Sequence, residues 1–166
     1  MKLLVRDAKP DDAESIVGIL NPIIEAGVYT AFDTTFTVEQ ERDYIDSFPP
    51  RVVFHVAVRC HDQRIVGFQS MEPFASFTHA FDHVGVLGSY VELSWRRRGI
   101  ATRLFEATFA AARRKGFEKI FTYVRADNPA ALRVYGKHGF VVVGTARRHL
   151  KTGSKYIDSM IIERFL

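Results

Sequence analysis

The chain has 166 residues, 47% of them hydrophobic, which is the size and composition of one globular domain with a sizeable core. Its 23 Lys and Arg against 19 Asp and Glu give a net charge of +4, which suits an anionic ligand without requiring a polyanion. Cys60 is the one cysteine, so the composition excludes an internal disulfide, and the sequence around it has no metal-ligand spacing. We expect one domain over residues 1–166, in the reducing cytoplasm, with no metal.

No association with a membrane is expected. The start, MKLLV, resembles a signal peptide briefly, but Arg6 and Asp7 end the apolar run too early. No later apolar stretch approaches the length of a membrane span.

The first elements in chain order are a strand and two helices. Residues 3–8 alternate like a strand. Residues 10–27 are periodically apolar and predict a helix that begins at an Asp11/Glu14 capping box and ends at Gly27. A second capping box, Thr37/Gln40, precedes a helix over 38–48.

Three strands and a long helix come next. Residues 53–60 and 64–74 predict a hairpin, and residues 83–93 a third strand rich in Val, Leu and Tyr. Residues 102–115 are helix-like, with basic residues in the last turn and Gly116 as the C-cap.

The last part predicts a strand over 119–126, a short helix over 128–139 and a final pair of strands over 140–150 and 155–165. The order is therefore β-α-α-β-β-β-α-β-α-β-β. It favours a mixed α/β sheet in one layer with helices on its faces. The strand, helix and strand between residues 84 and 126 imply a parallel pair joined by a right-handed crossover.

The turn Ser94–Thr102, "SWRRRGIAT", lies between a predicted strand and the long helix. The first amides of a helix have no internal partners and carry about half a positive charge, so an anion suits this position. Gly99 would allow close approach of a phosphate, Ala101 leaves room beside it, and Thr102 adds a hydroxyl donor. The alternative is a solvated turn in which Arg96, Arg97 and Arg98 serve no ligand.

This turn resembles the phosphate-binding element of the GNAT superfamily of N-acetyltransferases, whose signature is Gln/Arg-x-x-Gly-x-Gly/Ala. Arg96, Gly99 and Ala101 match that signature. The resemblance implies a fold with about seven strands and about four helices. It also implies acetyl-CoA as co-substrate, with Arg97–Thr102, including Ile100, around its pyrophosphate. The main chain of Ser89, Tyr90 and Val91 would line the acetyl and pantetheine groups.

A second motif supports this resemblance. Asn128 is a good N-cap and Tyr135 lies two helical turns later on nearly the same face, although a Tyr there could equally be core. In GNAT enzymes the similar pattern Asn-x-x-Ala-x-x-x-Tyr-x-x-x-Gly-Phe places the Asn on the pantetheine arm. It places the Tyr near the sulfur, as the acid that protonates the leaving thiolate. The branch that the chain looks most like contains phosphinothricin and L-amino acid N-acetyltransferases.

One position departs from that branch. Relatives of the phosphinothricin type carry a Glu three residues before Ser89, where this chain has Val86. The general base is therefore left open between a water chain and nearby side chains, namely Glu72, His79, Asp82, His83 and Glu92. The acceptor is also open. The residues between the first two helices that would shape its pocket, or simply pack the loop, are Glu25, Tyr29, Phe32, Asp33 and Phe36.

The leading hypothesis is direct transfer of acetyl from acetyl-CoA to a primary amine of a small molecule, an amino acid or a similar compound. The alternatives are acetylation of a protein N-terminus and a non-catalytic acetyl-CoA-binding module. Nucleic-acid binding through the basic runs 96–98, 113–115 and 147–151 lacks any recognised signature and is not expected. We also allow for a homodimer.

Overall fold

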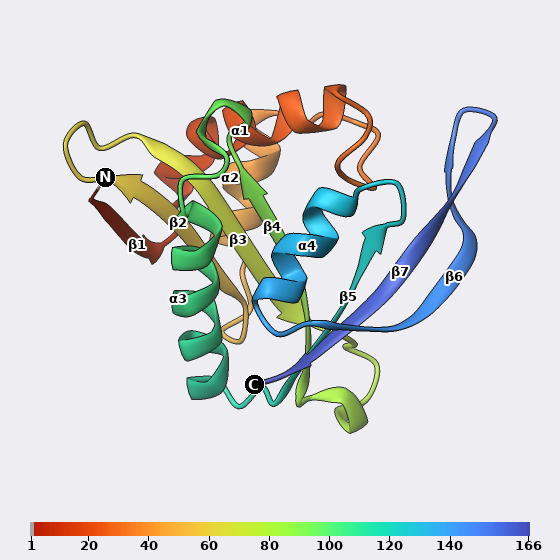
Figure 1. The fold of residues 1–166 in the computed structure, drawn as a ribbon. Coiled ribbons are helices and arrows are strands. Elements are labelled where there is room, and N and C mark those ends of the chain that lie inside the picture. Colours follow the sequence, from red (N-terminus) through yellow and green to blue (C-terminus); the bar gives the residue numbers. More distant parts are fainter. Residues whose placement is uncertain (1) are drawn as a thin grey trace.

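The computed structural model describes residues 2–166, and its strands form one mixed seven-stranded sheet (Figure 1). The sheet order is β1-β2-β3-β4-β5-β7-β6, and β4 and β5 form the expected parallel pair. The predicted element order and fold class are confirmed. The strands are β1 (Leu3–Asp7), β2 (Val53–Arg59), β3 (Ile65–Pro73), β4 (Val84–Val91), β5 (Lys119–Arg125), β6 (Val141–Thr152) and β7 (Lys155–Phe165).

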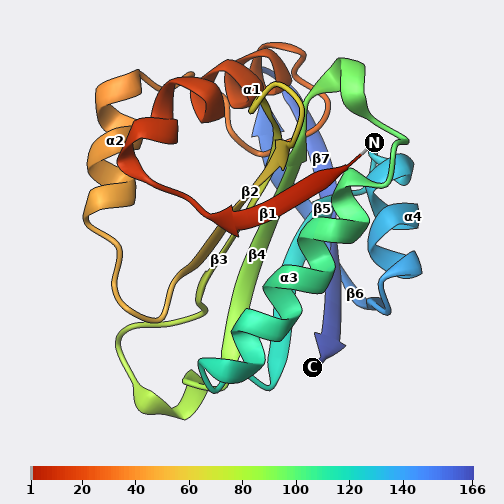
Figure 2. The same cartoon turned by 90° about the vertical axis from the view of Figure 1, so that its left-hand side faces the viewer.

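The four α-helices divide between the two faces of this sheet (Figure 2). Helices α1 (Ala13–Glu25) and α2 (Val38–Asp46) cover one face, and α3 (Ile100–Arg114) and α4 (Pro129–Lys137) cover the other. Each side buries its own apolar cluster. Ile16 and Ile23 of α1 pack on β2 and β3, whereas Phe105 and Phe109 of α3 pack on α4 and the centre of the sheet. Short 3-10 turns cover Pro10–Asp12, His79–Phe81 and Leu93–Trp95.

One of the two predicted capping boxes forms. The Thr37 hydroxyl accepts the Gln40 amide at 3.1 Å, and the Gln40 side chain accepts the Thr37 amide at 2.8 Å. The Asp11/Glu14 box is wrong, because the chain first makes the 3-10 turn and α1 begins at Ala13. Asp12 is the carboxylate in use there, since it accepts the Lys9 amide at 2.8 Å and pairs with Arg6 at 2.7 Å.

The sheet is opened at its centre, between β4 and β5. These strands pair at Val84 with Lys119 and at Gly85 with Ile120, and the Thr122 hydroxyl also donates to the Leu87 carbonyl at 3.0 Å. On its other side β4 stays paired with β3 as far as Val91. The second half of β4 therefore has a backbone edge that β5 does not cover. Within residues 2–166, no helix is both long and apolar enough to cross a membrane.

Candidate active site

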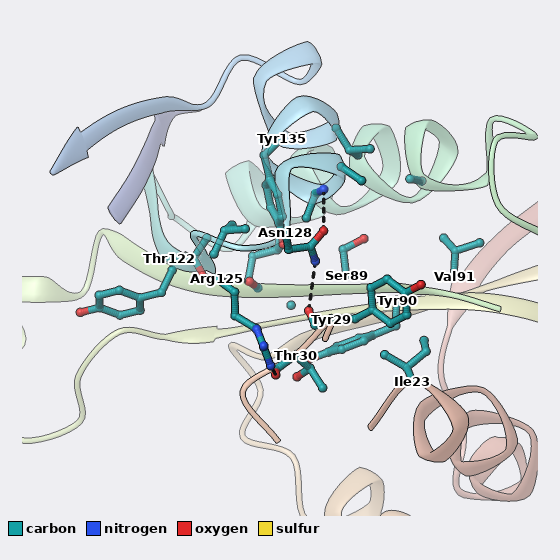
Figure 3. A pocket seen from close by; sticks show the side chains of 18 of the residues that line it. Ile23, Tyr29, Thr30, Ser89, Tyr90, Val91, Thr122, Arg125, Asn128 and Tyr135 are labelled. Atoms are coloured by element: carbon teal, nitrogen blue, oxygen red, sulfur yellow. Dashed lines mark hydrogen bonds between the residues drawn. The ribbon is translucent and has the colours of Figure 1, made fainter. Parts of the chain in front are cut away.

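A cavity of about 1140 Å³ lies where β4 and β5 separate (Figure 3). Its wall includes Phe105 of α3 and Tyr135 of α4 from one face of the sheet, and Ile23 of α1 and Phe32 from the other. Figure 3 shows Tyr135 and Asn128 on one side of β4 and Ile23 and Thr30 on the other. The cavity therefore passes through the opened sheet and is accessible to groups from both faces.

The N-terminus of α3 at this cavity has no side-chain cap. Gly99 occupies the N-cap position with φ of 77°, a left-handed conformation that favours glycine, and a Cβ there would meet open space. Arg97 is also left-handed, with φ of 61°. Successive amides in such a turn, together with the first amides of the helix, form a concave anion site. Ile100, Ala101 and Thr102, which carry those helical amides, line the cavity.

The three arginines of this turn have different places. Arg96 and Arg97 line the cavity, and the Arg96 guanidinium carbon lies 4.0 Å from the ring centroid of Tyr29. Arg98 stands outside the lining residues, with its guanidinium carbon 4.7 Å from the ring centroid of Trp95. The structure therefore brings two of the three predicted arginines to the cavity.

Ser89, Tyr90 and Val91 line the cavity along the opened edge of β4. Alternation along the strand directs Ser89 and Val91 to the α3 face and Tyr90 to the α1 face, where its ring stacks on Phe68 at 4.9 Å. Burial raises the pKa of the Tyr90 phenol. Because β5 diverges here, amides and carbonyls of this segment are available to an extended ligand.

Helix α4 brings Asn128 and Tyr135 to the cavity. The Asn128 side chain accepts the Ala131 amide at 3.1 Å and donates to the Tyr29 carbonyl at 3.3 Å, which leaves one N–H and one lone pair free of these two bonds. The buried Tyr135 ring packs edge-on against Phe105 and Phe140, at 5.5 and 5.0 Å. Burial, and then the neighbouring Tyr90 phenol, raises the pKa of Tyr135, so Tyr135 keeps its proton at neutral pH.

The loop between α1 and α2 closes the other side of the cavity and is fixed by Arg125, which sequence reasoning missed. The Arg125 guanidinium donates to the carbonyls of Gly27 and Thr30 at 2.9 and 3.1 Å, and pairs with Asp127 at 2.9 Å. Of the loop residues proposed for the acceptor pocket, Tyr29 and Phe32 line the cavity, whereas Glu25, Asp33 and Phe36 stand outside its lining.

Among the five side chains considered for the general base, Glu72 lines the cavity. Glu92 pairs with Arg64 at 2.7 Å, and His79 and Asp82 bind each other at 3.0 Å on the 3-10 turn before β4. His83 precedes β4 and joins β5 through its carbonyl. These four stand outside the lining of the cavity.

Two histidines that the sequence did not single out also line the cavity. His138 stacks on Phe105 at 4.4 Å, its Nε2 lies 3.4 Å from the Thr102 hydroxyl, and burial lowers its pKa. Because His138 follows Tyr135 by three residues, the two lie on the same helical face, and this spacing could have predicted that His138 also reaches the cavity. His149 lies where the pairing of β6 with β7 shifts register, beside left-handed Arg148. Such an irregularity redirects a side chain and leaves no simple sequence pattern.

The relatives of this chain are acetyltransferases. Residues 25–140 match the model of the acetyltransferase (GNAT) family. The L-amino acid N-acetyltransferase of Escherichia coli is 27% identical over 108 residues, which cover 64% of this chain and 65% of that protein.

Solved structures share the fold. A GCN5-related N-acetyltransferase from Kribbella flavida matches with a TM-score of 0.86 and 28% identity, over 99% of this chain and 98% of that one. The phosphinothricin acetyltransferase from Sinorhizobium meliloti, solved in complex with acetyl-CoA, matches with a TM-score of 0.90 and 18% identity, over 100% and 89%. Since the family match spans more than half of the chain and includes both motifs, this protein belongs to the GNAT family of acetyl-CoA-dependent N-acetyltransferases.

Proposed function

We propose that this protein transfers the acetyl group of acetyl-CoA directly to the primary amine of a small molecule, an amino acid or a compound similar to one. The observation that carries the proposal is the uncapped N-terminus of α3, which opens on the same cavity as the unpaired edge of β4. Together they offer an anion site for the pyrophosphate and a strand edge for the pantetheine arm. The substrate class rests on the names of the relatives from Escherichia coli and Sinorhizobium meliloti.

The roles that we propose for single residues come from the resemblance to GNAT enzymes, and the places of these residues at the cavity support them. The amides of Gly99–Thr102 hold the pyrophosphate, Ser89–Val91 and Asn128 the pantetheine arm, and Tyr135 protonates the leaving sulfur. We also propose that residues 1–166 act as one domain in the cytoplasm. The homodimer stays a prediction, which light scattering of the purified protein tests.

The first experiment measures thermal stability with and without acetyl-CoA. Binding to the folded protein at 100 times Kd adds about 2.7 kcal/mol, which raises the Tm of a chain of this size by roughly 5–10 °C. Gly99→Glu, which puts a carboxylate at the anion site, should abolish that rise. Gly116→Glu is the matched control, because Gly116 is also left-handed, with φ of 81°, and also faces open space, but lies at the opposite end of α3.

A rise in Tm that survives Gly99→Glu would show that the pyrophosphate binds elsewhere. A screen of amino acids, other small amines and N-terminal peptides for release of the CoA thiol then identifies the acceptor. Turnover of peptides in preference to every small amine would replace the proposed substrate class with a protein N-terminus.

A further inference from the structure

Position 86 lacks the carboxylate that the resemblance leads one to expect, but the strand beside it carries one. Val86 pairs directly with Glu72 across β3 and β4. Directly opposite residues of an antiparallel pair project from the same face of the sheet, with Cβ atoms about 5 Å apart. Both residues line the cavity. Glu72 thus brings a carboxylate to the same wall as Val86, one strand further from the gap between β4 and β5.

Helix α2 holds this carboxylate in place. The Tyr44 hydroxyl donates a hydrogen bond to Oε1 of Glu72, and the Tyr44 ring packs edge-on against Phe48 at 4.8 Å. Burial, and then the bond to Glu72, raises the pKa of Tyr44, so the phenol stays a donor at neutral pH. A donor on one oxygen fixes the orientation of the carboxylate and leaves the second oxygen available to a ligand.

The surroundings of Glu72 suit a cationic amine. Phe74, Tyr123 and His149 line the cavity together with it, and the rings of Tyr123 and His149 stack at 5.4 Å. Aromatic faces and a carboxylate together attract an ammonium group. Arg125, the arginine of β5 that lines the same cavity, is already paired with Asp127 and with loop carbonyls, so it does not neutralise Glu72 by pairing with it.

We propose that Glu72 binds the ammonium group of the acceptor and takes its proton, in the role that Val86 cannot fill. This inference rests on the proposed acetyl transfer. A proton passes from the ammonium to Glu72, and the freed nitrogen lone pair forms the N–C bond to the thioester carbon. The C–S bond then breaks, and the sulfur takes the proton of Tyr135. The second proton lost by nitrogen restores the Tyr135 phenol, and Glu72 releases its own proton to water.

The test compares Glu72→Gln with Glu92→Gln, which removes a nearby carboxylate outside the cavity lining. With the best alkylamine from the screen at pH 7, Glu72→Gln should lower kcat/KM by about 10²-fold or more, since general-base catalysis contributes this much. Glu92→Gln should stay within about threefold of the parent protein, since Glu92 lies outside the cavity lining and a surface substitution of this kind changes stability little. Both variants should keep the rise in Tm with acetyl-CoA.

A second acceptor separates proton removal from mere folding or binding. With a hydrazide, which is already neutral at pH 7, the loss in Glu72→Gln should shrink to about tenfold or less, since no proton has to be removed before attack. With the alkylamine, kcat/KM of Glu72→Gln should rise with pH as the neutral amine accumulates. Tyr44→Phe tests positioning: its kcat/KM should fall less than that of Glu72→Gln, and the loss should again be larger for the alkylamine.

Other ionisable groups could give a pH dependence of their own. Glu41 and Tyr90 act on Tyr44, and Tyr123, Arg125 and His149 line the same cavity as Glu72. His149→Gln is therefore run in parallel. The proposal is overturned if Glu72→Gln keeps the parent's kcat/KM for the alkylamine, or if its kcat/KM falls equally for the alkylamine and the hydrazide. It is also overturned if only His149→Gln shows a larger loss with the alkylamine than with the hydrazide. A parent protein that binds acetyl-CoA but acetylates no amine would instead overturn the proposed function.

Discussion

Tyr135 belongs both to the packed core and to the wall of the cavity. Its ring is buried between Phe105 and Phe140, and the residue also lines the cavity. Tyr135→Phe keeps the ring and removes the proton. We expect kcat to fall by about 10²-fold or more, because an acid positioned on the leaving group contributes that much.

The same variant should bind acetyl-CoA as the parent does, measured as the ligand-induced rise in Tm. Because burial raises the pKa of Tyr135, the parent should not lose activity through its deprotonation near the usual phenol pKa of 10.0. Unchanged turnover in Tyr135→Phe would assign the protonation of sulfur to water or to another group.

Helix α2 carries a carboxylate that weakens the fold at high pH. Glu41 is buried, and burial raises its pKa from 4.5 to about 7. Between these values the folded protein holds a proton that the unfolded chain has lost, so stability is fully present below pH 4.5 and declines as pH rises through 7. Glu41→Gln should therefore raise the free energy of unfolding at pH 8 by at most about 3 kcal/mol, and raise Tm with it. At pH 4 the variant should leave both nearly unchanged.

Urea or thermal unfolding at the two pH values measures this effect. Glu39→Gln, at an exposed position of the same helix, is the control and should show no comparable gain at pH 8. Equal gains from both variants would mean that general charge, rather than burial of Glu41, sets the effect.

Local patterns predicted those elements and site residues whose structure depends on near neighbours in the chain. Gly99, Asn128 and Tyr135 belong to turns and helices whose geometry their own segments determine, and all three line the cavity. Glu72 and Arg125 could not be assigned in this way. The position of Glu72 at the cavity depends on the register of β3 against β4, which places it opposite Val86, 14 residues later in the sequence. Arg125 donates hydrogen bonds to a loop that precedes it by almost 100 residues.

At the scale of the whole molecule, the sheet consists of two parts, β1–β4 and β5–β7, joined by few backbone pairs. A ligand that lies along β4 and against α4 contacts both parts. We expect acetyl-CoA to slow amide hydrogen exchange in β4 from Gly88 to Val91 and also in α4 and β5. Exchange measured by mass spectrometry with and without ligand checks this, and protection confined to the start of α3 would contradict it.

Across this narrow junction the two parts are held mainly by side chains. Phe105 and Phe109 of α3 meet Tyr135 and Phe140, and these rings connect the long helix to the C-terminal part. We expect their packing to set the width of the gap in which we propose that the co-substrate binds. We therefore expect affinity for acetyl-CoA to depend in part on residues such as Phe109 and Phe140, which lie outside the cavity lining. A smaller side chain at either position should weaken acetyl-CoA binding as well as lower the stability of the fold.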